Sequence, residues 1–191
     1  MRHICLMSKI RPETYEAIVE AAFLVFSEDP TASLADVANR AGVGRATLHR
    51  HFPGRPELMR TLAKTAMSEL SNAIEKTTAN AESYEESFRL SFHAMVPLAN
   101  RQLFLVHQGL ETDEEVAAIY KANLNELRED VEKAKGEGVF DPAIPTAWIV
   151  SSYEHLTYAA WALVQSGEAT PKQAAELAWR TLKIGLNGEK V

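Results

Sequence analysis

Residues 33–58 read SLADVANRAGVGRATLHRHFPGRPEL and hold two short segments of helical spacing around a glycine. In the first segment, Val37, Ala38 and Ala41 recur at the spacing of one helix face. Gly42 follows, and glycine adopts the left-handed conformation in which helices often end. Two short helices joined by a glycine-containing turn of three to four residues are typical of a helix-turn-helix. The stretch therefore predicts this motif.

The second short segment, residues 45–52, has one apolar face and one polar face. Leu48 and Phe52 are four residues apart and are expected to point inward together. The segment starts with an arginine, which can pair with O6 and N7 of guanine, and with methyl groups that can contact a thymine methyl. In a helix-turn-helix, these first positions of the second helix reach base edges in the major groove. We therefore expect base contacts from Arg45, Ala46 and Thr47.

Other polar residues of this stretch can hold the DNA backbone, because contacts to phosphates fix a protein's position on the duplex. Ser33 has the side chain of a helix N-cap, and Asp36 three residues later gives a near capping-box arrangement. Arg55 follows a Pro-Gly break and precedes a helix, so it is either a phosphate contact or a solvated charge. For His51 the alternative is a capping or surface role. The predicted backbone contacts are Ser33, Gly44, His49, Arg50, His51 and Arg55.

Outward from this stretch, the rest of the chain has the spacing of helices, with glycine and proline mostly between the periodic segments. Before the motif, apolar residues from Tyr15 to Phe26 predict an amphipathic helix of roughly 15 residues after Pro12. After the motif, helices are predicted over residues 56–77, 84–96, 97–109, 113–135, 145–166 and 171–186. No alternating strand pattern occurs, so the expected fold class is all-α.

Charge is unevenly distributed along the chain. The formal net charge of −6 by itself argues against nucleic-acid binding. Residues 1–67, however, contain 9 Lys and Arg against 7 Asp and Glu, whereas residues 68–191 contain 11 against 19. This asymmetry is compatible with a small DNA-binding head on an acidic body.

Several other classes of protein are disfavoured. No apolar run approaches the roughly 18 residues that span a bilayer, so we expect no membrane association. Cys5 is the single cysteine, which rules out an intrachain disulfide and thiolate zinc fingers and fits a cytoplasmic protein. Common catalytic and nucleotide-binding motifs do not occur, and the acidic residues at 111–115 fit the start of a helix. We expect neither an enzyme nor a cofactor.

At the residues of the motif, the sequence resembles the tetracycline-repressor (TetR) family of transcriptional regulators. The head of that family has Thr or Ser, an apolar-Ala pair, Ala-Gly-Val-Ser, a segment ending in Leu-Tyr-x-His-Phe, and Lys or Arg before Glu-Leu. The matching residues here are Ser33, Val37-Ala38, Ala41-Gly42-Val43-Gly44, Leu48-His49-Arg50-His51-Phe52, Arg55 and Glu57-Leu58. Gly44 replaces the usual Ser or Ala, and His49 replaces a Tyr that commonly contacts a phosphate in the family.

The resemblance implies about nine helices in three parts. Residues 1–10 would form a loose tail, residues 11–55 the helix-turn-helix domain, and residues 56–191 a regulatory and dimerisation domain. The implied function is a repressor that binds a palindromic operator in double-stranded DNA as a homodimer and is released by a small-molecule effector. An activator and a helical interaction module without DNA binding are the alternatives that stay open.

The last two helices form the dimer contact in that family, and their sequence here fits this role. Residues 145–166 and 171–186 are rich in Ala, Leu and Trp. Together they carry more apolar surface than one helical hairpin can hide, so we expect a two-fold four-helix bundle. The residues concerned are Trp148, Leu156, Ala159, Leu163, Leu177, Leu182 and Ile184.

The regulatory body contains many aromatic residues, and an apolar cavity with a few polar groups is the usual site for a small ligand. Most aromatic residues at helical spacing are instead ordinary core. The spacing of His93, His107 and His155 matches no known metal-binding pattern, so we expect no metal. The predicted pocket residues are Phe92, Phe104, His107, Trp148 and Tyr158.

Overall fold

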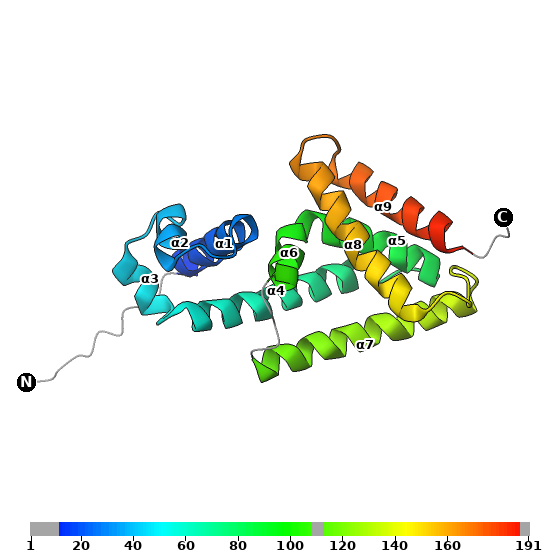
Figure 1. The fold of residues 1–191 in the computed structure, drawn as a ribbon, viewed down its shortest axis with the longest axis horizontal. Coiled ribbons are helices and arrows are strands. Elements are labelled where there is room, and N and C mark those ends of the chain that lie inside the picture. Colours follow the sequence, from blue (N-terminus) through cyan, green and yellow to red (C-terminus); the bar gives the residue numbers. More distant parts are fainter. Residues whose placement is uncertain (1–11, 108–112, 188–191) are drawn as a thin grey trace, which may run out of the picture. The chain divides into compact units, whose positions relative to one another are not determined.

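The computed structural model describes residues 12–107 and 113–187, and the regular secondary structure of these residues is helical throughout (Figure 1). The predicted all-α fold class is confirmed. The structure forms two compact units, Met1–Ala63 and Lys64–Val191. The division falls after Ala63, inside one long helix, whereas the sequence placed it after Arg55. The expected loose tail, residues 1–10, lies outside the described residues.

The first unit contains α1 (Pro12–Glu28), α2 (Leu34–Arg40), α3 (Arg45–His51) and the first turns of α4 (Arg55–Thr78). In this unit α2 packs against both α1 and α3. Burial of each large apolar side chain stabilises the unit by about 1.5–3 kcal/mol. The buried side chains include Ile18, Ala22, Phe23, Phe26, Val37, Ala38, Leu48, Phe52, Leu58 and Leu62. The inward positions predicted for the two short helices are therefore largely confirmed, although Ala41 is only half-buried beside the turn.

The turn between α2 and α3 depends on Gly42. Its φ angle is 66°, in the left-handed region, as the sequence predicts. The N–H of Val43 donates to the carbonyl of Ala38 at 2.9 Å, and the N–H of Gly42 donates to that of Asn39 at 3.2 Å. These bonds satisfy carbonyls at the end of α2 that have no partner within the helix. A side chain at Gly42 would strain this backbone conformation.

The second unit continues α4 from Lys64 and adds six further helical elements. Within it, α8 packs against α9 and α7, and α9 packs against α5 (Figure 1). These elements are α5 (Tyr84–Met95), the 3₁₀ helix η1 (Val96–Leu98), α6 (Ala99–His107), α7 (Glu114–Gly136), α8 (Thr146–Gln165) and α9 (Pro171–Leu186).

The predicted single helix over residues 97–109 is wrong at its start. The chain forms η1 first, and α6 begins at Ala99. Pro97 lacks an N–H group and has a fixed φ, so the chain makes a tighter 3₁₀ turn there before the α-helix begins. Residues 108 and 109 lie outside the described residues.

Tyr153 of α8 is the centre of an aromatic cluster in the second unit. Its ring centroid lies 4.8 Å from that of Phe92 and 5.7 Å from that of Phe88. Phe88 also packs edge-on against Phe140 at 5.3 Å. The buried Tyr153 hydroxyl donates to Sδ of Met95 at 3.0 Å. The cluster therefore ties α5 to α8 and to the turn that follows α7.

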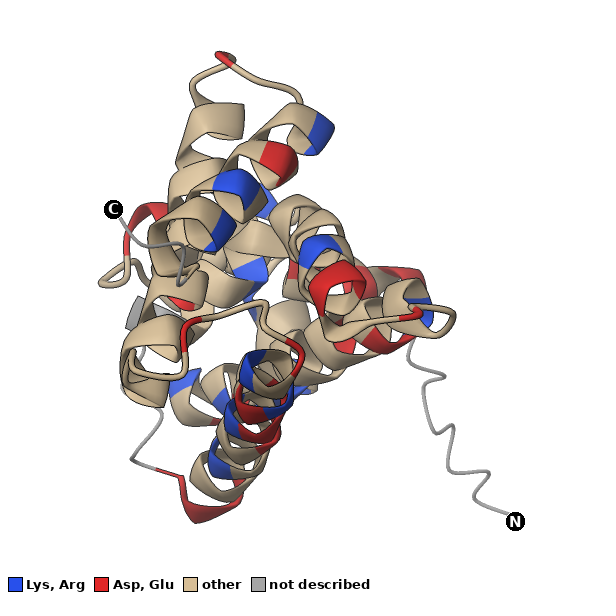
Figure 2. Cartoon of the chain, turned by 90° about the vertical axis from the view of Figure 1, so that its right-hand side faces the viewer, with Lys and Arg blue, Asp and Glu red and all other residues tan. Residues whose placement is uncertain are grey.

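The helices of the second unit differ in surface charge. Acidic and basic residues are interspersed along α7 (Figure 2), where Lys133 pairs with Asp130 at 3.2 Å and Lys135 with Glu132 at 3.3 Å. By contrast, Glu154 is the single Lys, Arg, Asp or Glu residue in α8. The surface of α7 is therefore highly charged, whereas that of α8 is almost uncharged.

Large apolar side chains of α8 and α9 are exposed. Trp148 is 63% and Tyr158 48% exposed on α8, and Leu177 is 41% and Ile184 71% exposed on α9. Leu182, which the sequence assigned to the same surface, is instead buried within the unit. An exposed apolar face of this kind typically marks an interaction surface.

Candidate nucleic-acid interface

The polar face of α3 is the candidate DNA-contacting surface. Leu48 is only 1% exposed and anchors the helix in the core of the first unit. Thr47 is half-buried beside it. Burial of one side of α3 leaves the predicted contact residues together on its outer side. The exposed residues are Arg45, Ala46, His49 and Arg50.

The start of α3 has an extended N-cap residue, Gly44, with φ −72° and ψ 151°. Its carbonyl accepts hydrogen bonds from the N–H groups of Thr47 at 2.9 Å and Leu48 at 3.1 Å. Gly44 has no side chain to cap the first N–H groups of the helix. Such N–H groups are suited to a phosphate oxygen, and phosphate contact at Gly44 stays a prediction.

The start of α2 is fixed by the predicted capping box. The Ser33 N–H donates to Asp36 Oδ2 at 2.8 Å, and the Asp36 N–H donates to Ser33 Oγ at 3.3 Å. The Ser33 hydroxyl also donates to Asp36 Oδ2 at 2.6 Å. Ser33 therefore has a structural role inside the head, and its contact with DNA stays a prediction.

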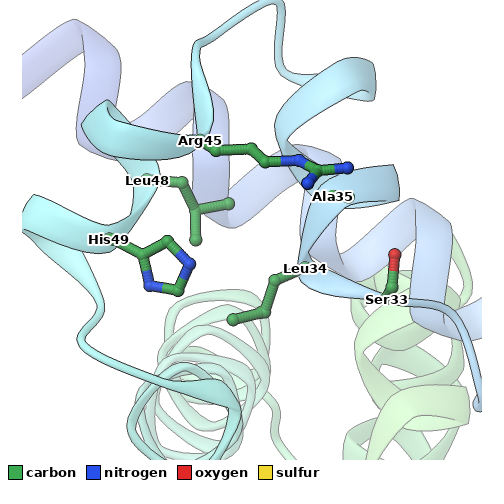
Figure 3. A pocket seen from close by; sticks show the side chains of 6 residues that line it. All are labelled: Ser33, Leu34, Ala35, Arg45, Leu48 and His49. Atoms are coloured by element: carbon green, nitrogen blue, oxygen red, sulfur yellow. The ribbon is translucent and has the colours of Figure 1, made fainter.

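An open hollow of about 370 Å³ lies between α2 and α3 (Figure 3). Figure 3 shows the Arg45 side chain extending from α3 toward α2 and ending beside Ala35. The lining residues are Ser33, Leu34, Ala35, Arg45, Leu48 and His49. This hollow is thus lined both by Arg45, the predicted base contact, and by His49, a predicted phosphate contact.

The Asp36 carboxylate, in the first turn of α2, interacts electrostatically with Arg45. Hydrogen bonds from Ser33 hold the pKa of Asp36 below its ordinary value, and the positive charge of Arg45 contributes in the same direction. The sequence identified Asp36 only as part of a helix cap. Its proximity to Arg45 follows from the angle between two helices, which no local pattern specifies.

Arg55 is engaged inside the first unit. Its Nη2 donates to the carbonyl of Pro30 at 2.6 Å, and its Nη1 donates to the carbonyl of Ala32. Its guanidinium also lies over the ring of Phe26, with Cζ 4.5 Å from the ring centroid. The sequence predicts either a phosphate contact or a solvated charge for Arg55, and the structure adds a third role, because this side chain braces the loop between α1 and α2. Phosphate contact by Arg55 stays a prediction.

His51 ends α3 next to aromatic residues. Its ring centroid lies 6.3 Å from that of Tyr15, which stacks on Phe52 at 5.4 Å. The Nδ1 atom of His51 is buried and has no hydrogen-bond partner among the described residues. A phosphate contact from His51 would therefore involve its other ring nitrogen, and it stays a prediction.

The predicted ligand-contacting residues fall into different environments. Phe92 and Phe104 are completely buried, whereas Trp148 and Tyr158 lie on the exposed face of α8. The side chain of His107 lies outside what the structure describes. Two of the four described residues thus lie in the interior and two at the surface, and a pocket formed by this set stays a prediction.

Two further observations concern the described residues alone. They contain no group of three or more His, Cys, Asp or Glu residues placed to hold a metal ion. Among them, no helix combines the length and the apolar character that crossing a membrane requires.

Two comparisons of the sequence with known proteins, one with family models and one with individual proteins, agree in the kind of protein they find. The family described as "Bacterial regulatory proteins, tetR family" matches residues 18–62, the core of the first unit and the start of α4. The HTH-type transcriptional repressor LfrR of Mycolicibacterium smegmatis is 33% identical over 167 residues. That alignment covers 86% of this chain and 82% of LfrR.

Solved structures agree with this relationship. The TetR-like regulator LfrR from Mycobacterium smegmatis, in complex with proflavine, superposes with a TM-score of 0.74 at 27% identity. The match covers 91% of this chain and 96% of that one. The ketosteroid transcriptional regulator KstR2 of Mycobacterium tuberculosis has a TM-score of 0.76 at 16% identity, over 94% of this chain and 98% of its own. At that identity the likeness concerns the fold.

Proposed function

Since this chain belongs to the tetR family of bacterial regulatory proteins, we propose that it is a repressor that binds a palindromic operator as a homodimer and is released by a small organic molecule. Membership of the family makes it a DNA-binding transcriptional regulator. The observation that carries the proposal is the arrangement of α3, whose buried Leu48 leaves a row of polar and basic side chains outward. A cytoplasmic location, where operator DNA is found, is part of the same proposal.

Recognition of bases is assigned to the start of α3. Arg45 has the side chain for a bidentate contact to guanine, and Ala46 and Thr47 have methyl groups for thymine. His49 and Arg50, one turn further along, are placed for phosphates.

The exposed apolar side chains of α8 and α9 support the homodimer. A four-helix bundle of α8 and α9 from two copies would bury Trp148, Tyr158, Leu177 and Ile184. A two-fold dimer presents two copies of α3, which fit successive major grooves at about 34–36 Å. A protein of this symmetry fits a palindromic operator.

Release by a ligand is assigned to the second unit. A relative of similar sequence has been solved with proflavine, which supports a planar aromatic ligand here. Phe92, Phe104 and His107 stay as proposed pocket residues, whereas the exposure of Trp148 and Tyr158 suits the dimer face better.

The proposed mechanism of release uses α4, which spans the division between the two units. A ligand must bind the DNA-incompetent arrangement more tightly than the competent one. A coupling of about 1–3 kcal/mol would weaken operator binding roughly 5- to 150-fold, and operator would weaken ligand binding by the same factor.

A gel shift with the DNA upstream of the protein's own gene tests the proposal, with a coding-region fragment of equal length as the control. We expect a complex with the upstream fragment that survives excess nonspecific DNA. Equal binding to both fragments, or to neither, would contradict it and favour a helical interaction module. A reporter driven by the same upstream region distinguishes the repressor from an activator, because loss of the protein raises expression only in the first case.

A further inference from the structure

The imidazole of His51, the last residue of α3, has an exceptional nitrogen atom. In the part of the chain that the structure describes, His51 Nδ1 is the one buried side-chain nitrogen or oxygen without a hydrogen-bond partner. The hydroxyl of Thr157, by contrast, is buried and donates to the carbonyl of Tyr153 at 3.0 Å. Buried polar groups are nearly always paired in this way, so the exception at His51 requires an explanation.

Two aromatic rings contact this imidazole. The ring of Tyr15, in the first turn of α1, has its centroid 6.3 Å from that of His51, at an interplanar angle of 54°. The centroid of Phe52 lies 6.5 Å from that of His51, and Tyr15 and Phe52 stack on each other at 5.4 Å. Such arrangements are favourable for aromatic rings. Because Phe52 is buried in the core of the first unit, the three rings join the start of α1 to the end of α3 and restrict the orientation of the imidazole.

The burial of Nδ1 determines which ring nitrogen carries the proton. A neutral imidazole has one N–H donor and one acceptor nitrogen. A buried N–H group without an acceptor is rarer in proteins than a buried acceptor without a donor. Nδ1 of His51 is therefore the acceptor nitrogen, and the proton lies on Nε2. Since Nε2 is not among the buried atoms without a partner, its N–H group can reach an acceptor outside the protein.

His51 is also placed beside other predicted contacts with the DNA backbone. His49 and Arg50, which precede it in α3, are exposed. Phosphate oxygens accept hydrogen bonds from side chains of this kind. We propose that Tyr15 is a positioning residue for DNA binding, because its ring holds the imidazole of His51 so that the Nε2–H group donates to a phosphate oxygen. The inference rests on the proposed function, since it concerns how the same DNA-binding unit contacts its operator.

The first test replaces His51 with each of two amides. The amide nitrogen of Gln lies near the position of Nε2, whereas that of Asn lies near the position of Nδ1. Fluorescence anisotropy measures the binding of the full-length protein to the labelled upstream fragment and to the coding-region fragment. His51→Asn should weaken binding to both fragments by about ten- to hundredfold, because a phosphate contact carries no sequence information. His51→Gln should bind both within about threefold of the wild-type affinity.

The second test concerns Tyr15. Tyr15→Leu should weaken DNA binding by about three- to tenfold, whereas Tyr15→Phe, which keeps the ring, should bind like the wild-type protein. When His51 is already Asn, Tyr15→Leu should cause no further loss, since its effect passes through His51. Tyr120→Leu is the matched control, because Tyr120 on α7 is 37% exposed and Tyr15 is 36% exposed. Urea unfolding checks that each variant is folded under the conditions of the binding measurement.

Three results would overturn the inference while the wild-type protein binds the operator. They are wild-type affinity in His51→Asn, equal weakening by His51→Asn and His51→Gln, and a Tyr15→Leu loss that persists unchanged when His51 is already Asn. Tyr15→Phe as weak as Tyr15→Leu would also overturn it, because the Tyr15 hydroxyl would then contact DNA itself.

Failure of the proposed function gives a different result. A wild-type protein that binds the upstream and coding-region fragments equally has no operator there, and the His51 and Tyr15 variants still test the phosphate contact on either fragment. A wild-type protein that binds neither fragment overturns both the inference and the proposed function.

Discussion

The guanidinium of Arg55, at the first residue of α4, lies over the ring of Phe26 in α1, with 4.5 Å between Cζ and the ring centroid. The same guanidinium donates to the carbonyls of Pro30 and Ala32 in the intervening loop. One side chain thus holds together the end of α1, the approach to α2 and the start of α4. The loop that precedes the helix-turn-helix is therefore held in place by Arg55, a residue that follows the motif in the sequence.

Arg55→Ala should therefore destabilise the protein by about 1–3 kcal/mol, from the loss of two hydrogen bonds of a charged group and one cation–π contact. Arg55→Lys should lose most of the same stability, because an ammonium group lacks the planar fork that reaches both carbonyls. Urea unfolding measures both, with the exposed Arg40→Ala as the control. Equal midpoints for all four proteins would show that the bracing contributes nothing.

The same substitution at two glycines of the turn should affect stability differently. Gly42→Ser should destabilise the protein by about 1–2 kcal/mol, because φ is 66° there. Gly44→Ser should be neutral or stabilise it by a few tenths of a kcal/mol, since φ is −72° and a serine can cap α3. Neither position has a neighbouring atom within 4 Å of an added Cβ, so backbone conformation alone separates them. Thermal unfolding compares the two, and a Gly42→Ser protein as stable as Gly44→Ser would contradict the account of the turn.

Local patterns predicted the motif well, because its determinants lie within a few residues of each other. The capping box of Ser33 and Asp36, the left-handed Gly42 and the buried Leu48 all depend on short-range spacing. The partners of Arg55 lie 23 and 25 residues away, so no local pattern could reveal them.

Arg45→Ala should lower the affinity for the specific operator by about 1–3 kcal/mol and relax selection at one base position. Competition binding against single-base operator variants measures both effects. Arg128→Ala, which removes an exposed arginine of α7, is the matched control and should leave base preference unchanged. An unaltered preference in Arg45→Ala would exclude this residue as a base reader.

Ile184→Asp, and separately Trp148→Glu, should shift the protein from dimer to monomer at micromolar concentration. Both side chains are more than half exposed in one copy, so a charge there disturbs the proposed four-helix bundle and leaves the fold of the monomer intact. Sedimentation equilibrium without DNA gives the molar mass, and Ala122→Glu on the exposed side of α7 serves as the control. Dimers of undiminished strength in both variants would place the interface elsewhere.

Glu176 should contribute to stability in a pH-dependent manner. A hydrogen bond with His93 at 2.7 Å, and then one from Arg89, lower the pKa of Glu176 below its ordinary 4.5. A lowered carboxyl pKa adds stability above the ordinary value, and this stability is lost as the pH falls through the folded value. Glu176→Gln should therefore cost up to about 1 kcal/mol at pH 7, and less near pH 3, because the pair is partly exposed.

Urea unfolding at the two pH values measures this difference, and the exposed Glu168→Gln is the control. A cost for Glu176→Gln that is the same at both pH values would mean that the ion pair is not its source.

A DNase footprint of the wild-type protein on its upstream DNA tests the central claim most directly. The account predicts two protected half-sites related by two-fold symmetry, with centres one helical turn or a multiple of it apart, because two copies of α3 must enter major grooves on one face. Arg45→Ala should lose both half-sites together at the concentration that protects them in the wild-type protein. A single unsymmetrical protected site, or protection that Arg45→Ala leaves intact, would contradict the account.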